Sequence, residues 1–239
     1  ATAVEINVSI PNGNNYNSNI VYVETFEGMT TDELGVTIMR YFYKYKCTDL
    51  VLDCQGNGLG VYDTIIKEQY DPYTGETYQA MTSCNNPEMA ERCKVKNANK
   101  VVWCIKATAD FNSNAATLLR AGIKNGNINF LTSEFDAEEN LKNLSGYKSM
   151  SLAEQTKLQL PYIQTTMMIN EMINLEHEII NNKVKLKERT GMRKDRFSSL
   201  QYNYYVSQQL ALNMKPKQDF RNLVSQLTIR PARRVTNFE

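Results

Sequence analysis

Hydrophobic and polar residues alternate along the first part of the chain. Every second residue from position 4 to position 10 is aliphatic, which predicts a half-buried strand that starts almost at residue 1. The segment 11–19 is rich in turn-forming residues, and the residues from 20 to 26 alternate again. This pattern predicts an antiparallel hairpin.

The next stretch changes to helical spacing and then to a short aliphatic run. Thr30 or Thr31 begins a helix with apolar residues at helical spacing up to position 45. Residues 50–52 predict the end of a buried strand, and Asp53 falls at its carboxyl end, where ligands gather in open α/β sheets. The glycine-rich turn that follows leads into a helix predicted over 61–69.

The middle of the chain predicts further helices and strands. In chain order, these are a long loop or insertion over 71–98, a buried strand over 101–105, a helix over 110–124 ended by Asn125-Gly126, a short strand over 128–131, a helix over 134–144, a short helix from Ser151, and a longer helix from Pro161 to about His177. Strands and helices mixed in this way predict the α/β class with a mixed sheet.

The last part predicts a small hairpin and a long helix. Residues 179–189 form two short alternating runs around Asn181-Asn182. The helix after them carries Asp195 in its first turn, where the helix dipole favours a carboxylate. We expect one domain over 1–214 and a basic, extended or partly disordered tail over 215–239.

Composition excludes several protein classes. The chain is 42% hydrophobic and 22% charged, with a net charge of +1, so no global attraction to nucleic acid is expected. No apolar run is long enough to cross a bilayer, and no signal peptide is recognisable. The five cysteines form no CxxC pair, which favours reduced thiols over a zinc site or a disulfide framework.

Two carboxylates, Asp53 and Asp195, are the strongest candidates for chemistry. Each has an ordinary structural explanation, as a turn former and as a partner of the helix dipole. Together they suggest an acidic pair for Mg²⁺, although a two-metal site usually takes at least three carboxylates. The single histidine, His177, has no partner motif for nucleophilic catalysis, and the glycines after Asp53 lack the lysine and hydroxyl of a phosphate loop.

Four segments resemble the C-terminal nuclease domain of the large terminase subunit of tailed bacteriophages. In chain order they are LVLDCQGNGLGVYDTI, FNSNAATLLRAGIKNGNINFL, PYIQTTMMINEMINLEHEI and RKDRFSSLQYNYYV. The aspartate–glycine segment and the KDR-x-SSL-x-Y helix are the more specific of the four. The resemblance extends from the first strand to about residue 212.

This resemblance implies a ribonuclease-H-like fold, with a mixed sheet flanked by helices and a small β-hairpin before the last catalytic helix. It implies a metal-dependent endonuclease that holds two Mg²⁺ or Mn²⁺ ions and cuts concatemeric double-stranded viral DNA during packaging. Asp53 and Asp195 match the second and third acids of the family. The basic residues near Asp195 are then expected to contact DNA phosphates, namely Lys185, Lys187, Arg189, Arg193, Lys194 and Arg196.

The first acid of the family has no counterpart here. In the family it lies on the first strand of the sheet, and residue 1 corresponds to the start of the second strand. We therefore expect that this chain is N-terminally truncated, that it lacks the first strand, and that the fragment alone is short of one acidic ligand for activity. Glu5 and Glu24 are less favoured substitutes, because carboxylates on strands usually face solvent.

The resemblance also implies partners and a location. These are an upstream ATPase motor domain of the same polypeptide, the portal protein, the small terminase subunit and double-stranded DNA, in the host cytoplasm and transiently at the portal vertex of the procapsid, with no membrane. Two alternatives stay open. The first is a nuclease-fold docking module for portal or capsid without cleavage, and the second is a relative of resolvases or integrases.

Overall fold

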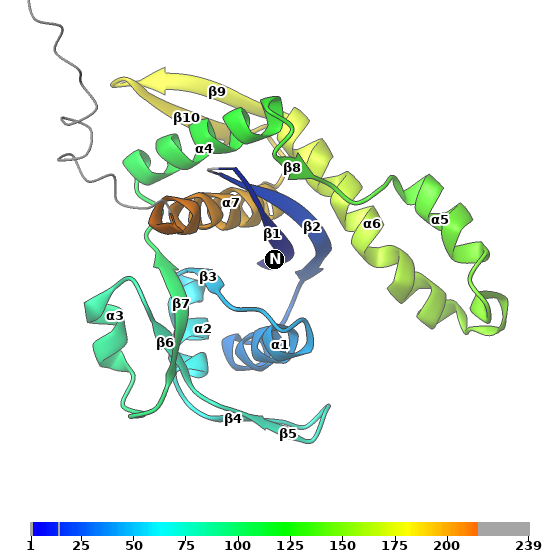
Figure 1. The fold of residues 1–239 in the computed structure, drawn as a ribbon, viewed down its shortest axis with the longest axis horizontal. Coiled ribbons are helices and arrows are strands. Elements are labelled where there is room, and N and C mark those ends of the chain that lie inside the picture. Colours follow the sequence, from blue (N-terminus) through cyan, green and yellow to red (C-terminus); the bar gives the residue numbers. More distant parts are fainter. Residues whose placement is uncertain (1, 14, 215–239) are drawn as a thin grey trace, which may run out of the picture.

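The computed structural model describes residues 2–13 and 15–214, which form a mixed α/β protein as predicted. One sheet contains β1 (Thr2–Asn12), β2 (Asn15–Phe26) and β8 (Ile128–Asn129), in that order. A second, parallel sheet has the order β3 (Leu50–Asp53), β7 (Asn99–Ile105) and β6 (Met81–Ser83). In the view of Figure 1, helix α7 (Asp195–Met214) lies between β3 and α4 (Ala109–Lys124).

The first hairpin is longer than the sequence pattern predicts. Its antiparallel register runs from Thr2 opposite Phe26 to Asn12 opposite Asn15, so the connection expected over 11–19 is wrong. Both strands extend through polar positions, because the outer half of the hairpin faces solvent and its backbone N–H and C=O groups still form hydrogen bonds between the strands. Nearer the core, the adjacent residues Glu5 and Ile6 are both buried. Since neighbouring side chains on a strand point to opposite faces, this part of β1 is covered on both faces.

The helices that flank β3 partly match their predicted bounds. Helix α1 (Thr31–Lys44) begins with a capping box between Thr30 and Glu33, as predicted. Helix α2 (Asn57–Ile65) begins earlier than predicted and ends before position 69, so the prediction over 61–69 was shifted. The reason is that Gly58 and Gly60 lie inside the first turns of the helix, and only Gly56 precedes it as the N-cap.

The segment 71–98 is structured, and its assignment as a loop or insertion is wrong. With its flanks it contains β4 (Gln69–Asp71), β5 (Glu76–Tyr78), β6 and α3 (Pro87–Arg92). Asp71 is fully buried and accepts two hydrogen bonds from the Arg40 guanidinium, at 2.6 and 2.8 Å. Asp71 therefore belongs to an internal ion pair. A local sequence pattern does not reveal this pair, because Arg40 is distant in the sequence.

Helix α6 (Leu152–Ile173) is continuous where two helices were predicted. Ser151 and Glu154 form a capping box at its start, and Pro161 lies inside it. The proline removes one helical hydrogen bond, while Thr165 and Met168 in the following turns are buried and keep the helix packed. Before it come α5 (Glu134–Lys142), which ends two residues earlier than predicted, and a short 3₁₀ helix, η1 (Tyr147–Ser149).

The predicted hairpin before the last helix is confirmed. It pairs β9 (Leu175–Ile180) with β10 (Lys183–Glu188), and Asn181 and Asn182 both adopt positive φ, as a two-residue turn of this kind requires. His177 lies exposed on β9, so its predicted place at a helix end is wrong, because strand pairing replaces the helix there. Asp195 begins α7 as predicted, and the predicted tail over 215–239 lies outside the described residues.

Two clusters of buried side chains form the core. The first joins α1, α2 and the parallel sheet, with Ile38, Tyr62 and Val102 among its members. The second joins β2, α4, α6 and α7, and includes Val23 and Leu200. All five cysteines are free thiols. Within residues 2–13 and 15–214, no helix has the length and apolar character needed to cross a membrane.

Candidate functional site

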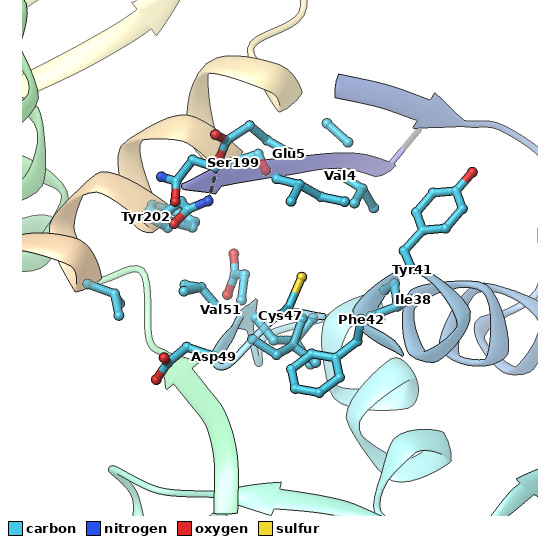
Figure 2. A pocket seen from close by; sticks show the side chains of 18 of the residues that line it. Val4, Glu5, Ile38, Tyr41, Phe42, Cys47, Asp49, Val51, Ser199 and Tyr202 are labelled. Atoms are coloured by element: carbon cyan, nitrogen blue, oxygen red, sulfur yellow. Dashed lines mark hydrogen bonds between the residues drawn. The ribbon is translucent and has the colours of Figure 1, made fainter. Parts of the chain in front are cut away.

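A cavity of roughly 1120 Å³ lies between β1 and β3. Helix α1 and the loop after it form one part of its wall, and one face of α7 forms another. Figure 2 shows Val4 and Glu5 of β1 with Ser199 and Tyr202 of α7 on one side, and Val51 of β3 on the opposite side. The cavity therefore lies between the sheet that contains β1 and β2 and the parallel sheet of β3, β7 and β6.

Asp53 lies on the wall of this cavity, at the carboxyl end of β3, as the sequence predicted. The strand itself is only half-buried, so the expectation of a fully buried strand is wrong, and the reason is that its free edge borders the cavity. Burial raises the pKa of the Asp53 carboxyl, and a hydrogen bond of 3.2 Å from the Gln55 backbone N–H to Oδ1 partly opposes that rise.

Asp195 lies on the wall of the same cavity, in the first turn of α7. Ser199 and Tyr202 follow one and two turns later, so they share its helix face and also line the cavity. The pKa of Tyr202 is raised to about 12, mainly by burial and in addition by the negative charge of Asp53. The face of α7 that carries Asp195 therefore approaches the end of β3 that carries Asp53.

A buried ion pair fixes the start of α7. Arg196 donates to Glu171 Oε1 at 2.5 Å and to Gln164 Oε1 at 2.6 Å, both on α6. The other carboxylate oxygen of Glu171 accepts the backbone N–H of Phe197 at 3.0 Å, which satisfies one free donor of the helix end. Arg196 is buried and already paired, so its predicted contact with DNA phosphates is not supported, and its contacts instead position Asp195.

Glu5 is the buried carboxyl group of β1 that faces the cavity. Asn203 of α7 donates to its Oε2 at 2.6 Å, while Oε1 is buried without a hydrogen-bond partner. Burial raises the pKa of Glu5 to about 8, and the hydrogen bond from Asn203 only partly counteracts this. Glu24 does not line the cavity. Its carboxylate instead accepts hydrogen bonds from the hydroxyl groups of Tyr22 and Tyr41.

Asp53 and Asp195 suit Mg²⁺ or Mn²⁺ in kind, since both ions prefer hard oxygen ligands. Within the part of the chain that the structure describes, no three side chains of His, Cys, Asp or Glu gather closely enough to hold a metal ion. Asp53 and Asp195 alone would supply only part of the oxygen ligands of such an ion. A two-ion centre would need further oxygen ligands from outside these residues or a movement of Glu5.

The predicted basic residues lie on or next to the β9–β10 hairpin, and several pair with acids. Lys187 pairs with Glu178, Arg189 with Glu176, Arg193 with Glu27, and Lys194 with Glu188. Lys185 and Lys194 also line a smaller cavity of roughly 520 Å³ between β10, α4 and α7. Apart from Arg196, the side chains of these basic residues are partly or largely exposed.

Several contributors to the site were not found from the sequence. Tyr202 could have been found from its two-turn spacing after Asp195 on an amphipathic helix. The contacts of Arg196 with Glu171 and of Glu5 with Asn203 join distant segments and have no local signal. Comparisons with family models, curated proteins and solved structures give no match to this chain.

Proposed function

We propose that this chain is a ribonuclease-H-like, metal-dependent endonuclease domain that hydrolyses phosphodiester bonds of double-stranded DNA. Its substrate would be concatemeric viral DNA, cut during packaging into the capsid. This is the function of the terminase nuclease domains that four of its segments resemble.

The observation that carries the proposal is the position of Asp53 and Asp195. They are far apart in the sequence, yet both line one cavity, one from the end of a strand and one from the first turn of a helix. Asp53 is partly buried, and this burial raises the pKa of its carboxyl. A divalent cation beside it would favour the ionised form and oppose that rise.

The strand order gives additional support for the fold. From one side of the cavity to the other, the strands lie in the order β2, β1, β3, β7 and β6, with the cavity between β1 and β3. Strand β1 is antiparallel to β2, whereas β3, β7 and β6 are parallel to one another. One added strand would unite them into a single mixed sheet with helices on both faces. That is the arrangement which the resemblance implies.

The basic residues around the β9–β10 hairpin suit a DNA backbone. Lys185, Lys187, Arg189, Arg193 and Lys194 surround the hairpin and the start of α7. Contacts from such residues to phosphates fix the position of a duplex and do not read bases. Their acidic partners are mostly exposed, so exchanging these surface pairs for phosphate contacts costs little.

The residues of the chain would then have separate roles in hydrolysis. Two bound ions would supply activation of a water molecule and stabilisation of the leaving oxygen. Asp53 and Asp195 would hold these ions, and Lys194 would offset part of the carboxylate charge next to Asp195. The Arg196–Glu171 pair would keep the first turn of α7, and therefore Asp195, in a fixed position.

Titration calorimetry with Mn²⁺ tests the metal site. We expect Mn²⁺ binding to weaken by at least about tenfold in Asp53→Asn and in Asp195→Asn. Glu139→Gln, at an exposed position of α5, is the matched control and should bind as the unchanged chain does. Equal binding by all four proteins, or no binding by the unchanged chain, would contradict the proposal.

A docking role without cleavage is the second candidate. Phe135 on α5 and Leu152 on α6 are 73% and 79% exposed, on helices that lie to one side of the sheets in Figure 1. Exposed apolar side chains of this kind can mark a protein contact. The docking role is supported if the chain binds no metal and associates with a portal protein. The double substitution Phe135→Ser and Leu152→Ser should then abolish that association.

A further inference from the structure

The smaller cavity, between β10, α4 and α7, differs in charge from the cavity that Asp53 and Asp195 line. Among the described residues, those lining the smaller cavity include no aspartate or glutamate, but they include three lysines, Lys183, Lys185 and Lys194. A cleft lined by charges of one sign concentrates ligands of the opposite sign. The smaller cavity therefore favours an anion.

Two helices begin at this cavity. Ala109 and Asn112 in the first turn of α4 line it, as do Phe197 and Ser198 in the first turn of α7. The amino end of a helix carries a partial positive charge that favours anions within its first turn. The two helix ends therefore add to the positive charge of the lysines.

The lysines are held by contacts that a phosphate can replace. Lys183 pairs with Asp110 and Lys194 pairs with Glu188, each at 2.6 Å, and the four side chains are between 37% and 70% exposed. Lys185 is exposed on the same strand as Lys183. Exposed ion pairs contribute little to stability. The three ammonium groups can therefore turn towards a phosphate at small cost.

The rest of the wall suits an organic group. Val184 and Leu186 of β10 supply apolar surface. Gln201 of α7 is 4% exposed, and its amide nitrogen donates to the backbone oxygen of Asn112 at 3.0 Å, which fixes the amide plane. Its amide oxygen is then a preoriented acceptor for an N–H group. Mostly apolar walls with a few fixed polar groups, in a volume of roughly 520 Å³, are typical of sites for small organic ligands, at about 300–1,000 Å³.

The two cavities share a wall on α7. Lys194, Ser198 and Tyr202 line both of them, and their spacing of four residues places them in one row along the helix. Figure 2 shows Tyr202 beside the larger cavity. The hydroxyl of Tyr202 also donates to Asn112 Oδ1 at 3.4 Å, on the side of the smaller cavity. A ligand in the smaller cavity therefore lies next to the start of α7, where Asp195 is.

We propose that the smaller cavity binds one nucleotide. Its phosphate lies among Lys183, Lys185 and Lys194, at the two helix ends. Its base lies against the apolar wall of β10, with a base N–H directed to the amide oxygen of Gln201. A phosphate alone would account for the lysines but not for the apolar and amide groups. The nucleotide is a free mononucleotide or an unpaired nucleotide of a DNA strand.

An unpaired nucleotide also deepens the proposed function, and this part rests on it. The shared wall of α7 places such a nucleotide beside the phosphodiester bond that Asp53 and Asp195 would hydrolyse. Bases in a duplex are stacked, so a nucleotide reaches a cavity only after it leaves the stack. The cut would then fall beside a frayed or unpaired position. Nucleotide binding itself does not depend on catalysis.

Backbone-amide NMR spectra of the chain with three probes, in a chelating buffer, test the cavity. The probes are thymidine monophosphate, inorganic phosphate and thymidine. We expect thymidine monophosphate to shift the amide signals of Val184, Leu186 and Gln201. It should bind about tenfold or more tightly than either other probe, because each of those lacks one half of the contacts.

Two variants test where the probe binds. Ala109→Leu enlarges a side chain on the cavity wall, and Lys185→Gln removes one charge. Each should weaken the binding of thymidine monophosphate by about fivefold or more. Lys124→Gln, exposed in the last turn of α4, is the matched control and should bind as the unchanged chain does. Thermal unfolding checks that all three variants are folded.

A short single-stranded oligothymidylate and a blunt duplex distinguish the two sources of the nucleotide. Equal weakening of oligothymidylate and monophosphate binding in Ala109→Leu, with duplex binding unchanged, would support an unpaired nucleotide of DNA. Weakening of monophosphate binding alone would support a free mononucleotide.

Three results would overturn the proposal. The first is equal binding of inorganic phosphate and thymidine monophosphate, which would indicate a general anion site. The second is amide shifts that lie away from the smaller cavity. The third is binding by Ala109→Leu and Lys185→Gln that equals binding by Lys124→Gln.

The Mn²⁺ calorimetry described above separates this proposal from the nuclease. Nucleotide binding by a chain that binds no Mn²⁺ supports the nucleotide cavity and contradicts the nuclease. Mn²⁺ binding that depends on Asp53 and Asp195, in a chain that binds no nucleotide, contradicts the nucleotide cavity alone.

Discussion

A side chain on Gly58 would overlap the backbone carbonyl oxygen of Asp53. The chain leaves β3 at Asp53 and enters α2 within a few residues, so the first turn of the helix passes directly over the strand end. Only a residue without Cβ fits this close approach. Gly58 therefore sets where the Asp53 carboxylate can lie in the cavity.

Replacing Gly58 by alanine should displace Asp53. We expect Gly58→Ala to lower the free energy of unfolding by about 1–3 kcal/mol, as overpacking usually does, and to weaken Mn²⁺ binding. Urea unfolding and calorimetry measure the two effects. Gly60→Ala is the control, because its new Cβ would meet the Thr31 side chain, at 2.9 Å, and not the backbone of Asp53. Unchanged stability and binding in Gly58→Ala would contradict this role.

Glu5 should make stability depend on pH. Its folded pKa of about 8 lies above the ordinary value of 4.5, so the folded state holds the proton more tightly. The stability that this proton contributes is complete below pH 4.5 and is lost as the pH rises towards 8. With one pKa unit worth about 1.4 kcal/mol, the full loss is on the order of 5 kcal/mol.

Glu5→Gln should remove this dependence while keeping a partner for Asn203. We expect the variant to be more stable than the unchanged chain at pH 8, with the difference shrinking towards pH 5. Thermal unfolding across that range measures it. Glu139→Gln, on the surface of α5, should follow the unchanged chain at every pH. A constant difference between Glu5→Gln and the unchanged chain would count against a raised pKa.

The contact between Arg196 and Glu171 should be important for stability. Arg196→Met would leave the Glu171 carboxylate buried with only the Phe197 N–H as a donor. Breaking a buried ion pair in this way costs about 3–5 kcal/mol, and urea unfolding measures the loss. Arg193→Met removes an exposed pair with Glu27 and should cost less than about 1 kcal/mol. Similar losses in both variants would refute the buried role.

Neutralising the hairpin cations should weaken DNA binding and its salt dependence. For Lys185→Gln with Lys187→Gln we expect the slope of log Kd against log salt to fall by about two, at roughly 0.9 for each lost phosphate contact. Fluorescence anisotropy with duplex DNA at several salt concentrations measures this. Lys142→Gln with Lys148→Gln changes the same charge on α5 and η1, away from the hairpin. An equal effect of both pairs would assign the binding to net charge alone.

Local patterns in the sequence determined most of the helices and the hairpins β1–β2 and β9–β10, but not the hairpin β4–β5. Thr30 and Glu33 cap α1, and Asn181-Asn182 make the turn of β9–β10, because these interactions involve residues close together in the chain. The positions of Asp53 after a strand and Asp195 in a first helical turn followed from the same kind of pattern. The nuclease assignment rests on the resemblance and stays a proposal.

Tertiary structure alone decided which of these residues meet. The burial of Asp71 against Arg40, of Arg196 against Glu171 and of Glu5 against Asn203 joins segments far apart in the chain. The cavity between β1 and β3 also depends on tertiary packing, since no local pattern places the edges of these two strands opposite each other. Pairing edges and buried partners depend on how distant segments pack, and hydrophobic periodicity records only which face of each element is covered.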